Sequence, residues 1–306
     1  MKPKKIPNLD LIRKRMGHHV SITPIQKWLD MGQEKLHRVL GSERRGVPYG
    51  KMIEVSGNES QGKTALAMEI AAYGQVDGAL IIWVGLEELM DKRWARLRGM
   101  NYDQIMRISP FLKETKSEPE LSSVEDLCAE VTASIKAGRK IGFQKFIVVI
   151  DSIAAMVTAK EAEVGELVTK TKKGKVTTDI AEFNMNVNTE LSRFLSRTLK
   201  KWAGYGMAYN VMFILINQIR TKPGVNFGNP EYTTGGRAPG YYSSIRVKLY
   251  RTKGGRITNS GKIIGIKGII SNFKNKVGGG SIEGDKIGFK LFFDRPAKFF
   301  EANEIK

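Results

Sequence analysis

One short stretch, Gly57 to Thr64, constrains what this chain can fold into more than any other, and its sequence is GNESQGKT. An apolar, strand-like run at residues 52–56 precedes it, and a helix-like run begins at Ala65. Its two glycines allow a tight turn whose N–H groups face phosphate oxygens. The lysine supplies positive charge for the β- and γ-phosphates, and the threonine hydroxyl suits Mg²⁺. A surface turn would not need these four residues, so the sequence predicts a nucleotide-binding loop.

Short apolar runs alternate with helix-like patterns along most of the chain. The runs are continuous, which is typical of strands covered on both faces, and they span residues 79–84, 146–150 and 211–216. Helix-like patterns accompany them at residues 63–73, 124–137 and 181–203. This order predicts an α/β fold with a mainly parallel central sheet. Beyond Ser244, runs separated by glycine turns predict an antiparallel extension of the sheet, at residues 245–250, 262–271 and 286–293.

The composition limits the partners and the compartment. Lys and Arg outnumber Asp and Glu by 50 to 31, for a net charge of +19, which favours a polyanionic partner over a merely basic surface. Cys128 is the only cysteine and lies far from the three histidines, so a disulfide framework and a zinc-ligand spacing are both excluded. The longest wholly apolar run, residues 79–84, is far too short to span a bilayer. We therefore expect a cytoplasmic protein with no membrane partner.

Two predicted strands end in carboxylates. Asp151 ends the run at 146–150, which places an acid at the carboxyl edge of the sheet, beside the phosphate loop and its Mg²⁺. Glu87 and Glu88 follow the strand that ends at Val84, so one of them can act as a general base in the same crevice. Either glutamate could instead be an acid at a helix N-terminus, and their spacing does not decide between them.

A third predicted strand ends in two amides, Asn217 and Gln218. A buried amide there could simply bond the backbone, or it could sense a γ-phosphate. The following segment, residues 219–236, is long, glycine-containing and basic. A loop joined to a γ-phosphate contact can become ordered when triphosphate binds and relax after hydrolysis.

Together these motifs resemble those of the RecA-type recombinases. The segments 216–220, 228–231 and 233–236 are similar to the second DNA-binding loop of that family. The likeness also covers the segments 57–64, 87–99, 149–152 and 274–276. It implies a RecA-like P-loop ATPase core at residues 43–296, a small N-terminal helical element for oligomerisation at 1–42, a tail at 297–306, and no counterpart of the family's C-terminal domain. From the residues alone, this N-terminal element has helix-like stretches at about residues 9–16 and 25–40 and could equally cap the core.

The resemblance also implies roles for single residues. Glu87, rather than Glu88, becomes the water-activating carboxylate, and Gln218 the sensor of the γ-phosphate of ATP. Asp91 and Trp94 match the positions that hold adenine, with Trp where Tyr is usual. The predicted catalytic residues are Lys63, Glu87, Gln218, Lys274 and Lys276, the last two reaching a neighbouring subunit's ATP. The predicted nucleotide-binding residues are Gly57, Asn58, Glu59, Ser60, Gln61, Gly62, Lys63, Thr64, Ala65, Asp91, Trp94 and Asp151, of which Thr64 and Asp151 hold Mg²⁺.

For DNA, the resemblance implies two loops, at about residues 158–178 and 219–236. The residues expected near the single strand are Arg193, Ser196, Lys200, Arg220, Phe227, Gly228, Asn229, Gly235 and Gly236. Pro223 and Asn226 replace apolar residues usual in the second loop, which leaves its base-wedging side chain open. The function implied is an ATP-dependent recombinase that forms head-to-tail filaments on single-stranded DNA and exchanges strands with duplex DNA. The alternatives are a hexameric helicase with the same core and a non-catalytic DNA-coating protein.

Overall fold

A computed structural model describes most of this chain, namely residues 25, 27–87, 90–110, 122–162, 167–172, 175–180, 187–221, 224, 228, 230–277 and 284–305. Its central feature is a ten-stranded sheet, in which nine strands run in the order β14-β13-β12-β11-β3-β9-β6-β4-β5 and β10 pairs with β9. These strands are β3 (Met52–Gly57), β4 (Leu80–Gly85), β5 (Ile105–Ile108), β6 (Phe146–Asp151), β9 (Val211–Thr221), β10 (Glu231–Thr233), β11 (Ile245–Asn259), β12 (Lys262–Asn275), β13 (Lys286–Phe292) and β14 (Lys298–Glu301).

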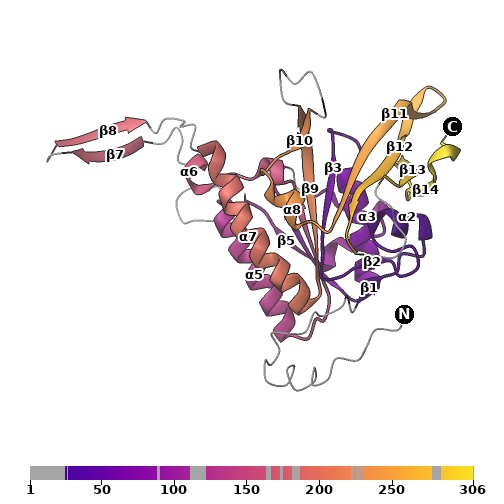
Figure 1. Ribbon diagram of the computed structural model, residues 1–306, viewed down its shortest axis with the longest axis horizontal. Helices are drawn as coiled ribbons and strands as arrows, with labels where there is room; N and C mark the ends of the chain where they lie inside the picture. The colour runs from indigo at the N-terminus through magenta and orange to yellow at the C-terminus, as the bar shows by residue number, and fades with distance from the viewer. Residues whose placement is uncertain are drawn as a thin grey trace, which may run out of the picture.

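The sheet changes character from one side to the other (Figure 1). Along the strand order from β5 to β11 every neighbouring pair is parallel, whereas β11, β12, β13 and β14 pair antiparallel and β10 pairs antiparallel with β9. This confirms the predicted α/β class, its mainly parallel sheet and its antiparallel extension. The helices are α2 (Glu34–Leu40), α3 (Lys63–Val76), α4 (Lys92–Leu97), α5 (Val124–Lys140), α6 (Ala159–Ala162), α7 (Val187–Tyr209) and α8 (Ala238–Tyr242), with short 3₁₀ turns η2 (Tyr102–Gln104), η3 (Ile153–Ala155) and η4 (Ala302–Glu304).

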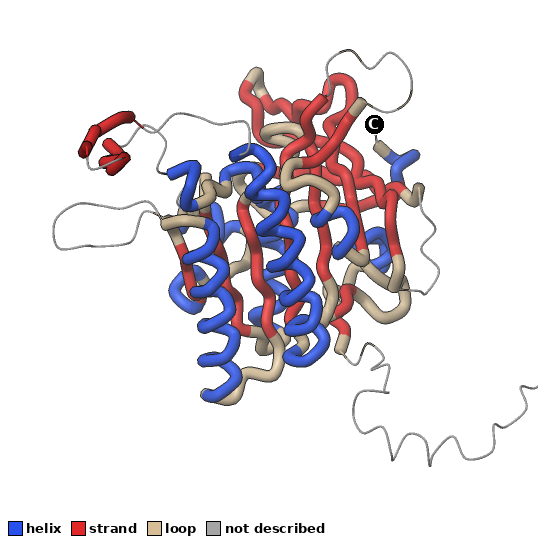
Figure 2. Tube along the Cα trace, turned by 60° about the vertical axis from the view of Figure 1, so that its left-hand side comes forward, coloured by secondary structure: helices blue, strands red, loops and turns tan. Residues whose placement is uncertain are grey.

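The sheet separates two hydrophobic cores. Along β6, Ile147 and Val149 pack with α3 on one face, whereas Phe146, Val148 and Ile150 pack with α5 and α7 on the other. Figure 2 shows α5 and α7 lying across one face of the sheet. Because successive strand residues point to opposite faces, a strand covered on both sides must be apolar throughout. The apolar runs in the sequence are therefore continuous because helices cover both faces of the sheet.

The N-terminal region differs from its prediction. A helix-like pattern over 25–40 yields a helix only at Glu34–Leu40, while Trp28–Leu29 forms strand β1 and pairs with β2 (Val47–Pro48). The Asp30 carboxylate accepts a bond from the Gly32 N–H at 2.8 Å, and Gly32 has a φ of 64°, so a turn interrupts the helical pattern. The buried side chains of Leu29 and Leu36 join the core of their own protomer. A role of residues 1–42 in oligomerisation stays a prediction, and residues 1–24 and 26 lie outside the described chain.

Other elements were not predicted. Strand β5 and helix α4 were not recognised as elements, and the expected first DNA loop, residues 158–178, contains α6 and part of a hairpin of β7 (Leu167–Lys172) and β8 (Lys175–Ile180). This segment is rich in Val and Thr, which favour strands. The hairpin projects away from the sheet in Figure 1. None of the helices in the described part of the chain combines the length and apolar character that crossing a membrane requires.

Candidate active site

The predicted phosphate loop joins β3 to α3. Gly57, the last residue of β3, has no room for a side chain, because an added Cβ would lie 2.6 Å from the carbonyl oxygen of Leu249. Gly62 is the N-cap of α3 and has a φ of 89°, which favours glycine. The Lys63 ammonium donates to the Asn58 carbonyl at 2.7 Å, and the Asn58 N–H donates to Gln61 Oε1 at 3.0 Å. These contacts hold the loop closed around the N-terminus of α3, where backbone N–H groups favour an anion.

The predicted polar strand ends meet beside this loop. Because β4, β6 and β9 are parallel neighbours, Glu87, Asp151 and Gln218 emerge at the same edge of the sheet. The Thr64 hydroxyl donates to Asp151 Oδ2 at 2.9 Å, and Gln218 Nε2 donates to Glu87 Oε1 at 3.0 Å. The Ser152 hydroxyl also donates to Glu87 Oε1. The structure therefore brings together the side chains that the sequence assigned to metal binding, water activation and phosphate sensing, while Glu88 lies outside the described residues.

The electrostatics of this edge favour a bound cation. Burial is the main reason that the pKa of Asp151 is raised to about 6, and the nearby Glu87 carboxylate adds to the shift. Burial also lowers the pKa of Lys63, while Glu87 and Asp151 oppose that change. A hydroxyl and a carboxylate are hard oxygen ligands of the kind that Mg²⁺ prefers, and Mg²⁺ sites often take only one or two carboxylates and complete their shell with phosphates and water. Thr64 and Asp151 fit that role; no cluster of three or more His, Cys, Asp or Glu side chains occurs among the described residues.

A pocket of about 530 Å³ opens next to the loop, a size that suits a nucleotide. One wall is apolar and aromatic: the Trp94 and Phe293 rings lie 6.2 Å apart, and the Arg98 guanidinium lies 4.4 Å from the Trp94 ring centroid. Arg98 is itself buried and bonds Glu69 of α3 at 3.3 Å, which positions this wall relative to the phosphate loop. The residues that line the pocket are Glu59, Ser60, Gln61, Gly62, Lys63, Thr64, Ala65, Glu87, Trp94, Asp151, Gln218, Arg251, Arg256, Ile263, Ile266, Leu291 and Phe293.

Three predicted nucleotide-binding residues do not line this pocket. Gly57 and Asn58 instead shape the loop, as described above. Asp91 is the N-cap of α4, where its Oδ1 accepts a bond from the Trp94 N–H at 2.6 Å. Asp91 thereby positions the helix that carries Trp94, and its direct contact with a base stays a prediction.

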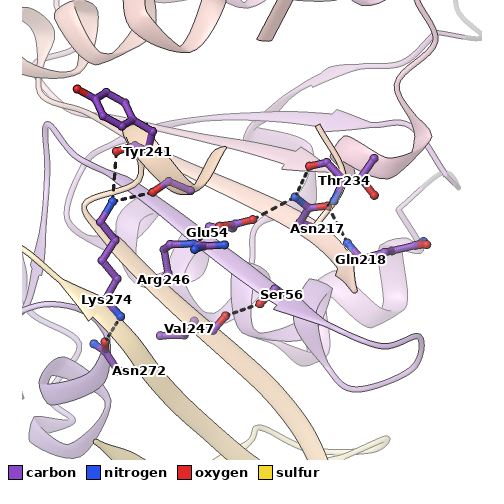
Figure 3. A network of polar contacts seen from close by, with 11 residues as sticks. Glu54, Ser56, Asn217, Gln218, Thr234, Tyr241, Arg246, Val247, Asn272 and Lys274 are labelled. Atoms are coloured by element: carbon purple, nitrogen blue, oxygen red, sulfur yellow. Dashed lines mark hydrogen bonds and ion pairs between the residues drawn. The ribbon is translucent and has the colours of Figure 1, made fainter. Parts of the chain in front are cut away.

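Lys274 and Lys276 also lie outside the pocket lining, near the end of β12. The Lys274 ammonium donates to the carbonyls of Gly240, at 2.7 Å, and Tyr241, at 3.2 Å (Figure 3). Lys276 is exposed. Their predicted role concerns the nucleotide of a neighbouring subunit, so their separation from the pocket of their own protomer does not contradict it.

A buried polar network starts at Gln218 and crosses the sheet (Figure 3). Asn217 is fully buried, and its Nδ2 donates to Glu54 Oε1 at 3.1 Å and to the Thr234 carbonyl at 2.9 Å. Its Oδ1 accepts the N–H groups of Thr234, at 3.2 Å, and Gln218, at 2.9 Å. The other oxygen of Glu54, a fully buried carboxylate, accepts from Arg246 Nε. The network therefore ties the Gln218 segment of β9 to Thr234, directly before Gly235 and Gly236.

The described candidates for DNA binding lie around α7 and the loop that follows β9. Arg193, Ser196 and Lys200 are exposed along one face of α7. Arg197, four residues after Arg193, is also exposed on this helix. Residues four apart share a helix face, so the spacing could have identified Arg197 as a further DNA-binding candidate, which the sequence analysis did not name.

The base of the second predicted DNA loop packs on this helix. A Cβ on Gly235 would lie 2.7 Å from Leu195 Cδ1, and one on Gly236 would lie 2.8 Å from Ser192 Oγ. Arg220, at the end of β9, and Gly228 are exposed. The remaining loop residues of interest, Phe227, Asn229, Pro223 and Asn226, lie outside the described chain.

Comparison with known families agrees with this architecture. The family model described as the RecA N-terminal domain matches residues 14–286, which is most of the chain. The matched range contains the phosphate loop, the strand-end carboxylates, the Asn217–Gln218 amides and the β11–β12 hairpin. The chain therefore belongs to the RecA family and is, in general terms, a RecA-like recombinase and ATPase.

Proposed function

We propose that this protein is a DNA-dependent ATPase that forms head-to-tail filaments on single-stranded DNA, searches duplex DNA for homology and exchanges strands. The observation that carries the proposal is the hydrogen-bonded path from Glu87 through Gln218 and Asn217 to Thr234. It joins a pocket suited to nucleotide hydrolysis to the base of a loop suited to DNA. Such a path gives the two sites a physical means of coupling.

In the proposed reaction the chain supplies positively charged groups that bind the phosphates and a general base that accepts a proton. Lys63 and the N–H groups at the start of α3 bind the phosphates, and Thr64 and Asp151 hold Mg²⁺, which neutralises the charge on the terminal phosphates when bound. Glu87 accepts a proton from the attacking water. The Ser152 and Gln218 donors to Glu87 orient its carboxylate.

The coupling that we propose starts at the Gln218 amide. Its Nε2 donates to Glu87 at 3.0 Å and can donate instead to a terminal phosphate oxygen placed in the same pocket. Asn217 accepts the Gln218 N–H and binds both the N–H and the carbonyl of Thr234, so a shift of this end of β9 reaches Thr234 directly. The DNA loop thereby adopts a conformation that depends on whether the γ-phosphate is present.

The positions of Lys274 and Lys276 support the proposal that the chain forms filaments. Lys274 and Lys276 stand away from the pocket of their own protomer, and we propose that they contact the nucleotide of the next one as an arginine finger does. Interfacial binding of this kind makes assembly depend on ATP. DNA is then bound by the exposed Arg193 and Lys200 of α7 and by the second loop, with phosphates neutralised by these cations.

The test is the ATPase rate with and without single-stranded DNA, with electron microscopy of the same samples. Lys63→Ala should abolish ATP-dependent filaments. Glu87→Gln should retain ATP binding and filaments but lose most turnover, because general base catalysis contributes about 10²–10⁴-fold. Unchanged turnover in Glu87→Gln would refute its assignment. A strand-exchange assay then decides between a recombinase and a helicase, and DNA binding without any DNA-stimulated ATPase activity would favour a non-catalytic coating protein.

A further inference from the structure

Two exposed arginines, Arg251 and Arg256, form part of the nucleotide pocket although no phosphate-loop motif contains them. Both belong to β11. They share the pocket with the phosphate-loop residues Gly62 and Lys63. Neither forms an ion pair or a side-chain hydrogen bond with another described residue. Guanidinium groups that pair with no described residue, in a pocket beside the phosphate loop, call for an explanation.

The length of β11 brings these arginines to the pocket. β11 runs parallel to β3, and their pairing ends at Lys248 and Ser56. The chain of β3 then turns into the phosphate loop, while β11 continues in the same direction (Figure 1). The next residue, Leu249, presents its carbonyl so close to Gly57 that a Cβ there would lie only 2.6 Å from the oxygen. Arg251, two residues further on, therefore stands beside the phosphate loop.

A bulge in β11 brings the second arginine to the same place. Arg251 pairs with Gly268 of β12 and Arg256 with Ile266, so residues 252–255 face only Lys267. Within the bulge, Gly254 has a φ of 70°, and a Cβ on Gly255 would lie 2.7 Å from the carbonyls of both Thr252 and Lys267. The bulge thus depends on glycine, and bulges beside active sites commonly redirect side chains. Here the two flanking arginines both line the pocket.

The order of the strands indicates which part of a nucleotide these arginines face. Glu87, Asp151 and Gln218 come from β4, β6 and β9, on one side of β3. The arginines come from β11, on the other side of β3, next to the pocket-lining Ile263 and Ile266 of β12 and Leu291 of β13. The γ-phosphate must lie toward the carboxylates that act on it. The arginines therefore lie toward the phosphates nearer the ribose.

We propose that Arg251 and Arg256 bind the α- and β-phosphates of the nucleotide held by the same protomer, and so retain ADP as well as ATP. The inference rests on the proposed function in that it takes the pocket to bind ATP. Guanidinium groups form strong, often bidentate, hydrogen bonds with phosphate oxygens. Because the contacts come from the same protomer, they act without DNA and without a neighbouring subunit, unlike those proposed for Lys274 and Lys276.

The experiment measures the dissociation constants of ATP, ADP and adenosine by calorimetry, with Mg²⁺, without DNA, and at protein concentrations where the chain is monomeric. The variants are Arg251→Ala, Arg256→Ala and the double variant. Matched controls are Lys253→Ala and Lys262→Ala, which remove exposed cations of the same hairpin that do not line the pocket. Each arginine variant should weaken ATP and ADP binding alike by about tenfold, which is the size of one hydrogen bond to a charged group. The controls should change little, and adenosine should bind equally well throughout.

Each other result has a definite meaning. Unchanged ATP and ADP affinities in the double variant would overturn the inference, and so would an equal loss in Lys253→Ala, because the effect would then be the general positive field of the hairpin. Loss of ATP binding alone would place the arginines at the γ-phosphate and refute the assignment. Arg251→Lys, which keeps the charge but not the fork, should recover only part of the affinity and guards against misfolding of the alanine variant. If the wild-type chain bound no ATP, the proposed function itself would be wrong.

Discussion

Replacing Asn217 by alanine should weaken both the fold and the coupling between nucleotide and DNA. The Asn217 side chain is fully buried and bonds Glu54, both backbone groups of Thr234, and the N–H of Gln218. Alanine removes all of these contacts and adds none. Glu54 keeps its Arg246 partner, so its carboxylate is not left alone.

The magnitude follows from the partners that lose their bonds. A neutral hydrogen bond contributes about 1 kcal/mol net and one to a charged group about 1.5–3 kcal/mol. The Glu54 bond and the bonds to Thr234 and Gln218 together suggest a loss of about 3–5 kcal/mol in the free energy of unfolding, allowing for relaxation and non-additivity. Domains of ordinary stability have about 5–15 kcal/mol in total. The variant should fold, but with a much smaller free energy of unfolding than the wild-type chain.

Urea denaturation measures this loss, and fluorescence anisotropy of labelled single-stranded DNA measures the coupling. In the wild-type chain ATP should raise DNA affinity; in Asn217→Ala the ratio of affinities with and without ATP should fall toward one, because Thr234 is no longer held to β9. Tyr49→Phe is a matched control. It removes a bond of 2.9 Å from the buried Tyr49 to Asp77, near the start of β3 and away from the pocket lining. It should lower stability without changing the ratio.

Two results would refute this reasoning. An Asn217→Ala chain as stable as the wild type would mean that the network contributes nothing to the fold. A destabilised chain with an undiminished effect of ATP on DNA affinity would mean that the coupling does not pass through Asn217.

Two further predictions concern Asp151 and Cys128, the pKa values of which are raised mainly by burial. Because the pKa of Asp151 is raised from 3.8 to about 6 in the folded, metal-free chain, its contribution to stability is full below about pH 4 and is lost as the pH rises through 6. Asp151→Asn should therefore leave the free energy of unfolding nearly unchanged at pH 4 and raise it by about 3 kcal/mol at pH 8, as measured by urea titration without Mg²⁺; a variant less stable than wild type at pH 8 would contradict this. Burial raises the pKa of Cys128 to about 12, so iodoacetamide should modify the native thiol far more slowly than the thiol unfolded in urea, and equal rates would show that Cys128 is accessible.

The candidate site was predictable where a residue's role depends on its position relative to a strand end. Asp151, Glu87 and Gln218 each follow a continuous apolar run, and parallel strands bring their carboxyl ends to one edge. The choice of Glu87 over Glu88 needed the family resemblance, because both follow the same strand. The carboxylate of Asp91 caps α4, and its direct contact with adenine stays a prediction of the resemblance.

Local sequence patterns did not reveal the pairing of some strands. The helical periodicity of residues 25–40 was interrupted because Trp28–Leu29 pairs with Val47–Pro48, a partner that periodicity does not reveal. The expected first DNA loop contains a hairpin, since strand propensity can be satisfied by pairing with the same segment. In both cases the outcome depended on which backbone groups found partners.

The amino-acid sequence alone determined the phosphate loop, the parallel core and the residues at its strand ends, because each follows from local chemistry and from short-range order along the chain. Only the tertiary structure decided that Phe293, Arg251 and Arg256 complete the pocket. These residues follow the phosphate loop by nearly two hundred positions or more, and their placement depends on the register of β11 against β12 and on one glycine bulge. Strand register is set by the pairing of whole strands, so no local motif predicts it.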